Sequence, residues 1–315
     1  MVIAAVTLAL LAIALAWPVP VLLASARWPS RAPGVALALW QAIALAGGLS
    51  MIGSLLTLGA IPFGARLVDS IDALWLTVDS GRIPPAAGFA NVLALGAAVL
   101  LAGHLLLNLA VTFVRADSQR RRHRYLVELL SSPSADYPRT RVLDHDAPLA
   151  YCLPGATRSA TVVSAGLLEL LDARELSAVV AHENAHLSQQ HHLVLLFFRS
   201  WRTALPWFPI AYLAENAVAL LVEMLADDQA RRIVDDRTLA RAIALVGASD
   251  APAVGTLASS APPGAPPIAP LVTLVGPRVT RLVTPQVPLA ASARLAVVAL
   301  AVGLVAMPAA LLLLA

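Results

Sequence analysis

Long apolar runs alternate with polar segments along this chain. Apolar residues continue almost without interruption through four segments, which are residues 2–25, 34–60, 86–114 and 288–315. A helix of about 20 apolar residues is long enough to cross the hydrocarbon core of a bilayer. The pattern therefore predicts four transmembrane helices. Pro18 and Pro20 should kink the far end of the first helix, because proline removes a backbone donor and clashes with the preceding turn.

Two polar side chains interrupt the third apolar run. His104 and Asn108 are four residues apart, so they share one face of a helix. Polar groups inside a membrane span point to function by default. The plainer interpretation, which we favour, is hydrogen bonding to a neighbouring helix.

The region between the third and last runs shows a different periodicity. Asp172 and Glu175 have the spacing of a capping box, which starts a helix near residue 173. The apolar positions that follow at helical spacing are Leu176, Val179, Val180 and Leu187. The pattern predicts a helix that contains "VVAHENAHLS" in its middle.

Weaker patterns surround this helix. Residues 119–130 continue the third span as a basic helix, and β-like runs at 149–153 and 159–166 flank the turn "PGATR". Residues 193–222 carry tryptophans beside arginines, which favours an interfacial helical hairpin, with an additional pair of spans left open. Residues 251–288 are rich in proline, alanine and glycine and predict a long irregular loop.

Composition agrees with a membrane protein. Charged residues make up 13% of the chain against about 25% in a typical soluble protein, and the mean hydropathy is +0.77. The expected fold is mainly α, with about four transmembrane helices and an α+β domain between the third and last spans. The expected domains are 1–114 (three N-terminal spans), 115–250 (the α+β domain), 251–287 (Pro/Ala-rich loop) and 288–315 (last span).

The distribution of arginine predicts the orientation of the chain in the membrane. The connection after the first run holds two arginines and no acid, and the one after the third begins "RADSQRRRHR". The connection 61–85 also holds two arginines but three aspartates, so it is net acidic. Positive loops stay in the cytosol. Both chain ends should therefore lie outside, with the region from 115 to about 287 in the cytosol. Because the arginines flank apolar runs, they suit anionic lipid, and no direct contact with nucleic acid is expected.

The chain has a single cysteine, Cys152, so an intrachain disulfide and a cysteine-rich zinc site are both excluded. The β-like run around it predicts a half-buried thiol in a strand. Any transition-metal site must therefore use histidine and carboxylate ligands.

The segment "HENAH" supplies such ligands. His182 and His186 are four apart on the predicted helix and can direct imidazole nitrogens at one zinc ion, with Glu183 beside them. Zinc makes a bound water acidic enough to supply hydroxide near neutral pH, and Glu183 would take its proton and pass it to the leaving amine. The five-residue pattern also arises by chance, so the surrounding sequence has to support it.

A catalytic zinc needs a third protein ligand, and the downstream segment "LLVEMLADDQARR" offers one. Glu223 and Asp227 share a helical face, so Glu223 would bind zinc and Asp227 would accept the second ring N–H of a ligand histidine. Glu215 lies on a similar face and stays open as the alternative ligand. His191 and His192 are expected to be interfacial or substrate-cleft residues rather than ligands.

These two segments resemble a known family. "GLLELLDARELSAVVAHENAHLSQQHHLVLL" and "VEMLADDQARR" are similar to the membrane metallopeptidases of bacterial β-lactam-sensor transducers, the antirepressor type. More distantly they resemble CAAX-protease and HtpX-like membrane gluzincins. The motifs cover about 145–235. The resemblance implies that His182, His186 and Glu223 bind zinc, that Glu183 is catalytic, and that Asp227 supports the ligands.

One departure limits this resemblance. The transducers continue past their last helix into an extracellular penicillin-binding sensor domain, whereas this sequence ends at Ala315. We therefore expect the protease core of this family without its response to β-lactam binding. The resemblance implies a multi-pass zinc endopeptidase of the bacterial cytoplasmic membrane that cleaves a cytosolic or membrane protein such as a transcriptional repressor. A homo-oligomer is left open as a further partner. The alternatives are HtpX-like quality control of membrane proteins and a non-catalytic membrane scaffold or adaptor.

Overall fold

A computed structural model describes most of the chain as two compact units. The described residues are 1–81, 84–134, 140–153, 160–206, 208–258, 271–284 and 286–315. The first unit, here called the helical unit, comprises Met1–Val111, Phe198–Glu215 and Leu289–Ala315. The second, here called the mixed unit, comprises Thr112–Phe197 and Asn216–Pro288. Each is described by itself.

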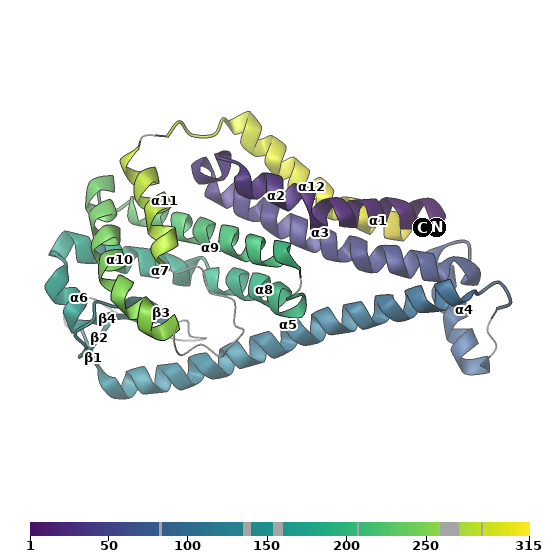
Figure 1. Cartoon of the computed structure of the whole chain (residues 1–315), viewed down its shortest axis with the longest axis horizontal. Coiled ribbons are helices and arrows are strands. Elements are labelled where there is room, and N and C mark those ends of the chain that lie inside the picture. The colour runs from purple at the N-terminus through teal and green to yellow at the C-terminus, as the bar shows by residue number, and fades with distance from the viewer. Residues whose placement is uncertain (82–83, 135–139, 154–159, 207, 259–270, 285) are drawn as a thin grey trace. The chain divides into compact units, whose positions relative to one another are not determined.

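The helical unit is built around three apolar helices that pack side by side (Figure 1). They are α1 (Val2–Ala16), α3 (Pro33–Ala60) and α12 (Ala291–Leu314). The shorter elements of this unit are α2 (Pro18–Ser25), η1 (Trp28–Arg31), η2 (Ile61–Phe63) and α4 (Leu67–Ser80). The predicted kink is confirmed, because α1 ends at Ala16 and α2 begins at Pro18.

The long helix α5 (Phe89–Leu130) begins in the helical unit and ends in the mixed unit. The expected third span and the basic helix after it are thus one continuous helix. Gly59 of α3 allows the close approach of α5, since a Cβ atom there would lie 2.7 Å from the backbone nitrogen of Leu95.

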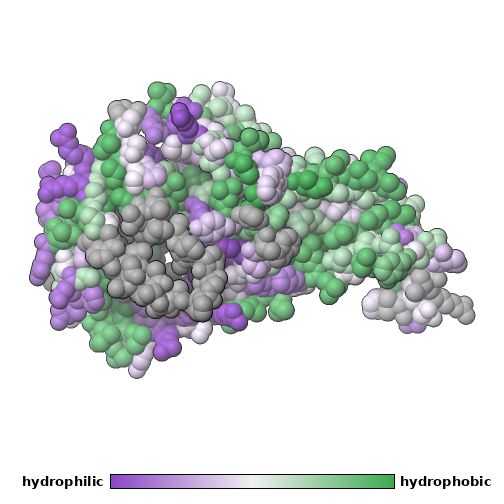
Figure 2. All heavy atoms as spheres, viewed as in Figure 1, coloured by the Kyte–Doolittle hydropathy of each residue, from purple (hydrophilic) through white to green (hydrophobic). Residues whose placement is uncertain are grey.

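Four helical segments of the described residues are long and apolar enough to cross a membrane, as the sequence predicts. They are Val2–Ser25, Pro33–Phe63, Phe89–Leu130 and Ala291–Leu314. Figure 2 shows hydrophobic residues over much of the surface of this unit. Large apolar side chains such as Ile3, Leu100 and Leu313 are more than 70% exposed. Apolar surface of this extent is typical of helices that face lipid.

The expected hairpin at 193–222 consists of the helices α8 (His191–Ala204) and α9 (Pro209–Ala230), and neither is among the candidate spans. His104 Nε2 lies 3.0 Å from the carbonyl oxygen of Ala204, and Asn108 Nδ2 donates to the carbonyl oxygen of Ser200 at 2.6 Å. The predicted helix–helix hydrogen bonding of His104 and Asn108 is therefore confirmed.

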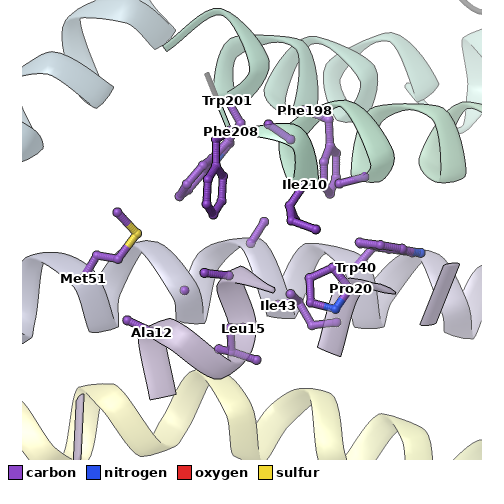
Figure 3. A pocket seen from close by; sticks show the side chains of 15 residues that line it. Ala12, Leu15, Pro20, Trp40, Ile43, Met51, Phe198, Trp201, Phe208 and Ile210 are labelled. Carbon is purple, nitrogen blue, oxygen red and sulfur yellow. The ribbon is translucent and has the colours of Figure 1, made fainter. Parts of the chain in front are cut away.

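The part of this hairpin that belongs to the helical unit borders an apolar pocket of about 520 Å³. Figure 3 shows Phe198, Trp201 and Phe208 directed toward α3, which contributes Trp40 and Met51. All the lining side chains are apolar or aromatic, so the pocket belongs to the hydrophobic interior of this unit.

The mixed unit contains a four-stranded sheet of order β1-β2-β4-β3. The strands are β1 (Ser131–Pro133), β2 (Thr140–Leu143), β3 (Ala150–Leu153) and β4 (Ala160–Ser164). β2 and β4 are parallel, whereas β1 pairs with β2 and β3 pairs with β4 in antiparallel fashion. β3 and β4 were expected from the sequence. β1 and β2 lie outside the two β-like runs that the sequence predicts.

Helices pack on this sheet and on one another. They are α6 (Ala165–Leu170), α7 (Ala173–Ser188), α10 (Asp236–Ala258) and α11 (Leu271–Val283). One core cluster joins β4 to α6 and α7 through Val163, Leu167 and Leu176, and a second joins α7, α9, α10 and α11. The predicted irregular loop at 251–287 is wrong for its two ends, because α10 extends to Ala258 and α11 is a regular helix that buries Leu282. Its middle, 259–270, lies outside the described residues.

Candidate metal centre

Helix α7 begins with the capping box that its sequence predicts. The Asp172 carboxylate accepts hydrogen bonds from the backbone nitrogens of Arg174 and Glu175, at 2.9 and 2.8 Å. The Glu175 carboxylate accepts from the backbone nitrogen of Asp172 at 3.0 Å. These reciprocal bonds satisfy free N–H groups of the first turn and fix where the helix starts. Because α7 begins at Ala173 and continues to Ser188, His182 and His186 both lie within it, four residues apart on one face.

Three side chains from two helices converge in the mixed unit. His182 and His186 of α7 place their Nε2 atoms 3.1 Å apart. The Glu223 carboxylate of α9 reaches them, with distances of 3.3 Å from Oε2 to His182 Nε2 and 3.5 Å from Oε1 to His186 Nε2. All three ligand atoms lie within 4.8 Å of one another.

These distances can be compared with the requirements of zinc. Ligand atoms about 2.0–2.1 Å from zinc and at tetrahedral angles lie about 3.3 Å from each other. The two Nε2 atoms are 3.1 Å apart, and the Glu223 contacts of 3.3 and 3.5 Å, which end on its two different oxygens, are close to this value. Two imidazoles and one carboxylate are also a donor set that zinc uses in peptidases. The residues therefore fit a zinc ion, with a fourth position left for water.

The second nitrogen of each imidazole also has a partner. His182 Nδ1 lies 2.9 Å from Asp227 Oδ1, in the relation expected from the E-x-x-x-D spacing. His186 Nδ1 lies 3.1 Å from Nδ1 of His191, whose Nε2 contacts Gln189 Oε1 at 3.0 Å. Partners of this kind fix the ring orientation and the tautomer of metal-binding histidines. Both imidazoles of the cluster are therefore held by a neighbour.

His191 lies outside the three-residue cluster, as the sequence predicts, but it is buried rather than interfacial. His191 is 2% exposed and contacts His186, so it is neither interfacial nor a member of the three-residue cluster. Gln190, just before His191, has a left-handed backbone with φ of 51°. The turn at Gln190 brings His191 back into contact with His186 of α7. Burial lowers the pKa of His191 to about 4, which keeps its ring neutral and able to accept a hydrogen bond.

Glu183 lies beside the cluster on α7. Burial raises the pKa of Glu183 to about 7, despite the opposing effect of His182. A carboxylate with this pKa can both accept and release a proton near neutral pH. Glu183 therefore has the position and the proton affinity that a general base at this site requires.

Cys152 of β3 is close to Glu183. Burial, followed by the charge of Glu183, raises the pKa of Cys152 to about 12. The thiol is half-buried in a strand, as the sequence predicts. Since a thiol with this pKa is protonated at neutral pH, Cys152 is a poor nucleophile and a poor metal ligand here.

An arginine absent from the predicted site completes the surroundings of Glu223 and Asp227. Arg278 of α11 is 9% exposed. Its Nε and Nη2 donate to the two oxygens of Asp227 at 2.8 and 2.6 Å, and its Nη1 lies 2.8 Å from Glu223 Oε2. Burial opposes ionisation of Glu223, but His182 and Arg278 outweigh it and lower the pKa of Glu223 to about 2. The Glu223 carboxyl is thus ionised at neutral pH.

Glu215, the alternative third ligand, has a different partner. Its carboxylate forms an ion pair with Arg202 of α8 within the helical unit. Among the described residues, the group that could hold a metal ion contains Glu223 and not Glu215. The geometry therefore favours Glu223 as the third ligand.

Two residues of the site were missed from the sequence. His191 was visible, but its contact with His186 depends on the left-handed backbone at Gln190. Arg278 fell in the expected loop, although Val275, Val279 and Leu282 repeat at helical spacing around it. That repeat was the available signal for α11.

Comparison with known proteins agrees with this geometry. Residues 116–249 match the model of Peptidase family M48, whose members are metallopeptidases. The matched segment contains α7 and the part of α9 that carries Glu223 and Asp227, and it ends before α11. No solved structure matches the chain. The family match and the four apolar helices together support a membrane metallopeptidase.

Proposed function

We propose that this chain is an integral-membrane zinc endopeptidase that cleaves a cytosolic or membrane protein. The convergence of His182, His186 and Glu223 at the spacing of tetrahedral zinc ligands, with Glu183 beside them, carries the proposal. The three residues hold the ion, and Asp227 and His191 orient the two imidazoles. A zinc ion bound there would supply Lewis acidity that makes water nucleophilic and polarises the peptide carbonyl.

The catalytic work of the protein would then fall to Glu183. In its ionised form Glu183 takes a proton from the attacking water, and it passes that proton to the amine that leaves when the peptide bond breaks. Its pKa near 7 suits both transfers. The nearby Cys152 stays protonated and takes no part in the chemistry.

The sheet offers a place for the substrate. Among the described strands, β3 pairs with β4 alone, so its other edge has backbone groups available for a partner. An extended peptide can add to such an edge through main-chain hydrogen bonds. Cys152, in the middle of β3, lies near Glu183, so a peptide on this edge would pass close to the general base. The proposed substrate segment is therefore extended when bound.

The loop charges support a cytosolic active site at the bacterial cytoplasmic membrane, with both chain ends outside. Alkaline phosphatase fused after Ala315 is expected to be active, because its disulfides form outside the cytosol. Green fluorescent protein at the same position should stay dark. Bright fluorescence together with an inactive phosphatase would contradict the proposed orientation.

Cleavage of a transcriptional repressor, as in a β-lactam-type response, is the role that the resemblance to sensor transducers favours. HtpX-like quality control is the second candidate, and the match to Peptidase family M48 favours it. We expect the proteomes of cells with the wild type and with Glu183→Gln to differ in one or two accumulating proteins if the chain is a regulator. Accumulation of many misfolded membrane proteins would instead indicate quality control. Identical proteomes would argue against any peptidase role.

A further inference from the structure

Helix α11 brings a buried cation to the metal centre from outside the matched family segment. α11 (Leu271–Val283) packs against α10 and carries two arginines three residues apart, Arg278 and Arg281. Arg281 pairs with Asp228 of α9 at 2.8 Å. Arg278 faces the cluster itself and is 9% exposed.

The guanidinium of Arg278 contacts two acidic side chains of α9. It makes a bidentate ion pair with Asp227, in which Nε donates to Oδ2 at 2.8 Å and Nη2 donates to Oδ1 at 2.6 Å. Its third nitrogen, Nη1, lies 2.8 Å from Glu223 Oε2. Asp227 Oδ1 also contacts Nδ1 of His182 at 2.9 Å. Arg278 therefore contacts Glu223 directly, and it reaches His182 both through Asp227 and by a longer contact of 3.4 Å from Nη2 to Nδ1.

Electrostatics explains why a cation is needed there. Glu223 and Asp227 are four residues apart on one helical face, and Asp227 is only 1% exposed. Two buried carboxylates on one face repel each other, and a buried charge without a partner is strongly destabilising. Arginine can satisfy both at once because its planar guanidinium offers several donors in a fixed geometry. Lysine would bring the same charge without that geometry.

We propose that Arg278 is a positioning residue of the metal centre, which holds Glu223 and Asp227 in the conformation that receives zinc. α11 is then a component of the peptidase site, although it lies beyond the segment that matches the family. This inference rests on the proposed zinc site.

The test is the zinc affinity of the full-length chain in detergent, measured by competition with a chelating indicator. Arg278→Gln should bind zinc about 10- to 100-fold more weakly, the usual cost of losing a partner of a metal ligand. Arg278→Lys should recover part of the zinc affinity, because lysine keeps the positive charge but cannot make the bidentate contact of a guanidinium group. Arg281→Gln is the matched control, since it removes an α11–α9 ion pair made with Asp228. It should keep wild-type zinc affinity.

Thermal unfolding of the metal-free proteins separates positioning from simple attachment of α11. Both glutamine variants lose one ion pair to α9 and should unfold at a lower temperature, but only Arg278→Gln should lose zinc affinity. Wild-type affinity in Arg278→Gln, or an equal loss in both variants, would overturn the proposal. If Arg278→Gln does not fold, weaker binding by Arg278→Lys than by Arg281→Gln supports the proposal and equal binding overturns it.

This readout does not depend on peptidase activity. A wild-type protein that binds zinc but cleaves nothing would contradict the proposed function and leave the assignment of Arg278 intact. A failure of Arg278→Gln to change zinc affinity would overturn the assignment of Arg278 and leave the peptidase proposal intact.

Discussion

Glu183→Gln is expected to bind zinc as the wild type does and to lose proteolytic activity by about 100- to 10,000-fold, the usual contribution of a general base. Glutamine keeps the size and polarity of the side chain, so the helix and the two histidines are undisturbed, but an amide cannot take a proton from water. The rate of substrate cleavage by the purified full-length protein, at equal zinc content, is the measurement.

A matched control for this variant is Glu169→Gln, which alters a glutamate of the neighbouring helix α6 outside the ligand cluster. We expect it to cleave at the wild-type rate. If Glu183→Gln retained wild-type activity at full zinc occupancy, Glu183 would not be the base and the proposed mechanism would be wrong. Loss of zinc from Glu183→Gln would also contradict the account, because it would make Glu183 a ligand.

Glu223→Gln is expected to lose zinc affinity by more than about 100-fold. This exceeds the loss that is typical when a residue hydrogen-bonded to a metal ligand is removed. The reason is that Glu223 is the anionic member of the three-residue cluster, and two neutral imidazoles alone leave the charge of the ion uncompensated. Zinc content after dialysis against a weak chelator, measured by elemental analysis, is the readout.

Glu215→Gln is the matched control because the sequence alone made Glu215 an alternative ligand. It removes the ion pair with Arg202 and should lower stability while zinc content stays at the wild-type level. The reverse result, with zinc lost from Glu215→Gln and kept by Glu223→Gln, would exchange the two assignments and contradict the geometry described here.

The sequence predicts elements best where local signals agree with each other. The start of α7 follows from Asp172 and Glu175, and the kink after α1 follows from Pro18 and Pro20. Both depend on bonds within a few residues, so no tertiary information is needed. The positions of the four apolar helices follow from length and hydropathy for the same reason.

The missed strands have weak local signals. β1 and β2 are three and four residues long and contain serine, threonine and arginine. Their regular structure comes from pairing, since β2 bonds to β4 about 20 residues later. Strand preference depends strongly on such neighbours, and a single sequence does not show them.

Helix α11 was missed for a different reason. Proline and glycine in residues 251–288 suggest a loop, and Pro277 lies inside the helix itself. What stabilises α11 is burial of Leu282 and the pairing of Arg278 and Arg281 with acids of α9, more than 50 residues earlier in the chain. The members of the candidate metal cluster could be predicted from short motifs, but the cation that pairs with Glu223 and Asp227 could not.

The central claim is that His182, His186 and Glu223 form one zinc site with an open position, and X-ray absorption at the zinc edge tests it most directly. The account predicts a shell of nitrogen and oxygen ligands at about 2.0–2.1 Å, with the signature of two imidazoles. This signal should disappear in Glu223→Gln. A sulfur ligand at about 2.3 Å, which only Cys152 and the methionines could supply, or an unchanged spectrum in Glu223→Gln would contradict it.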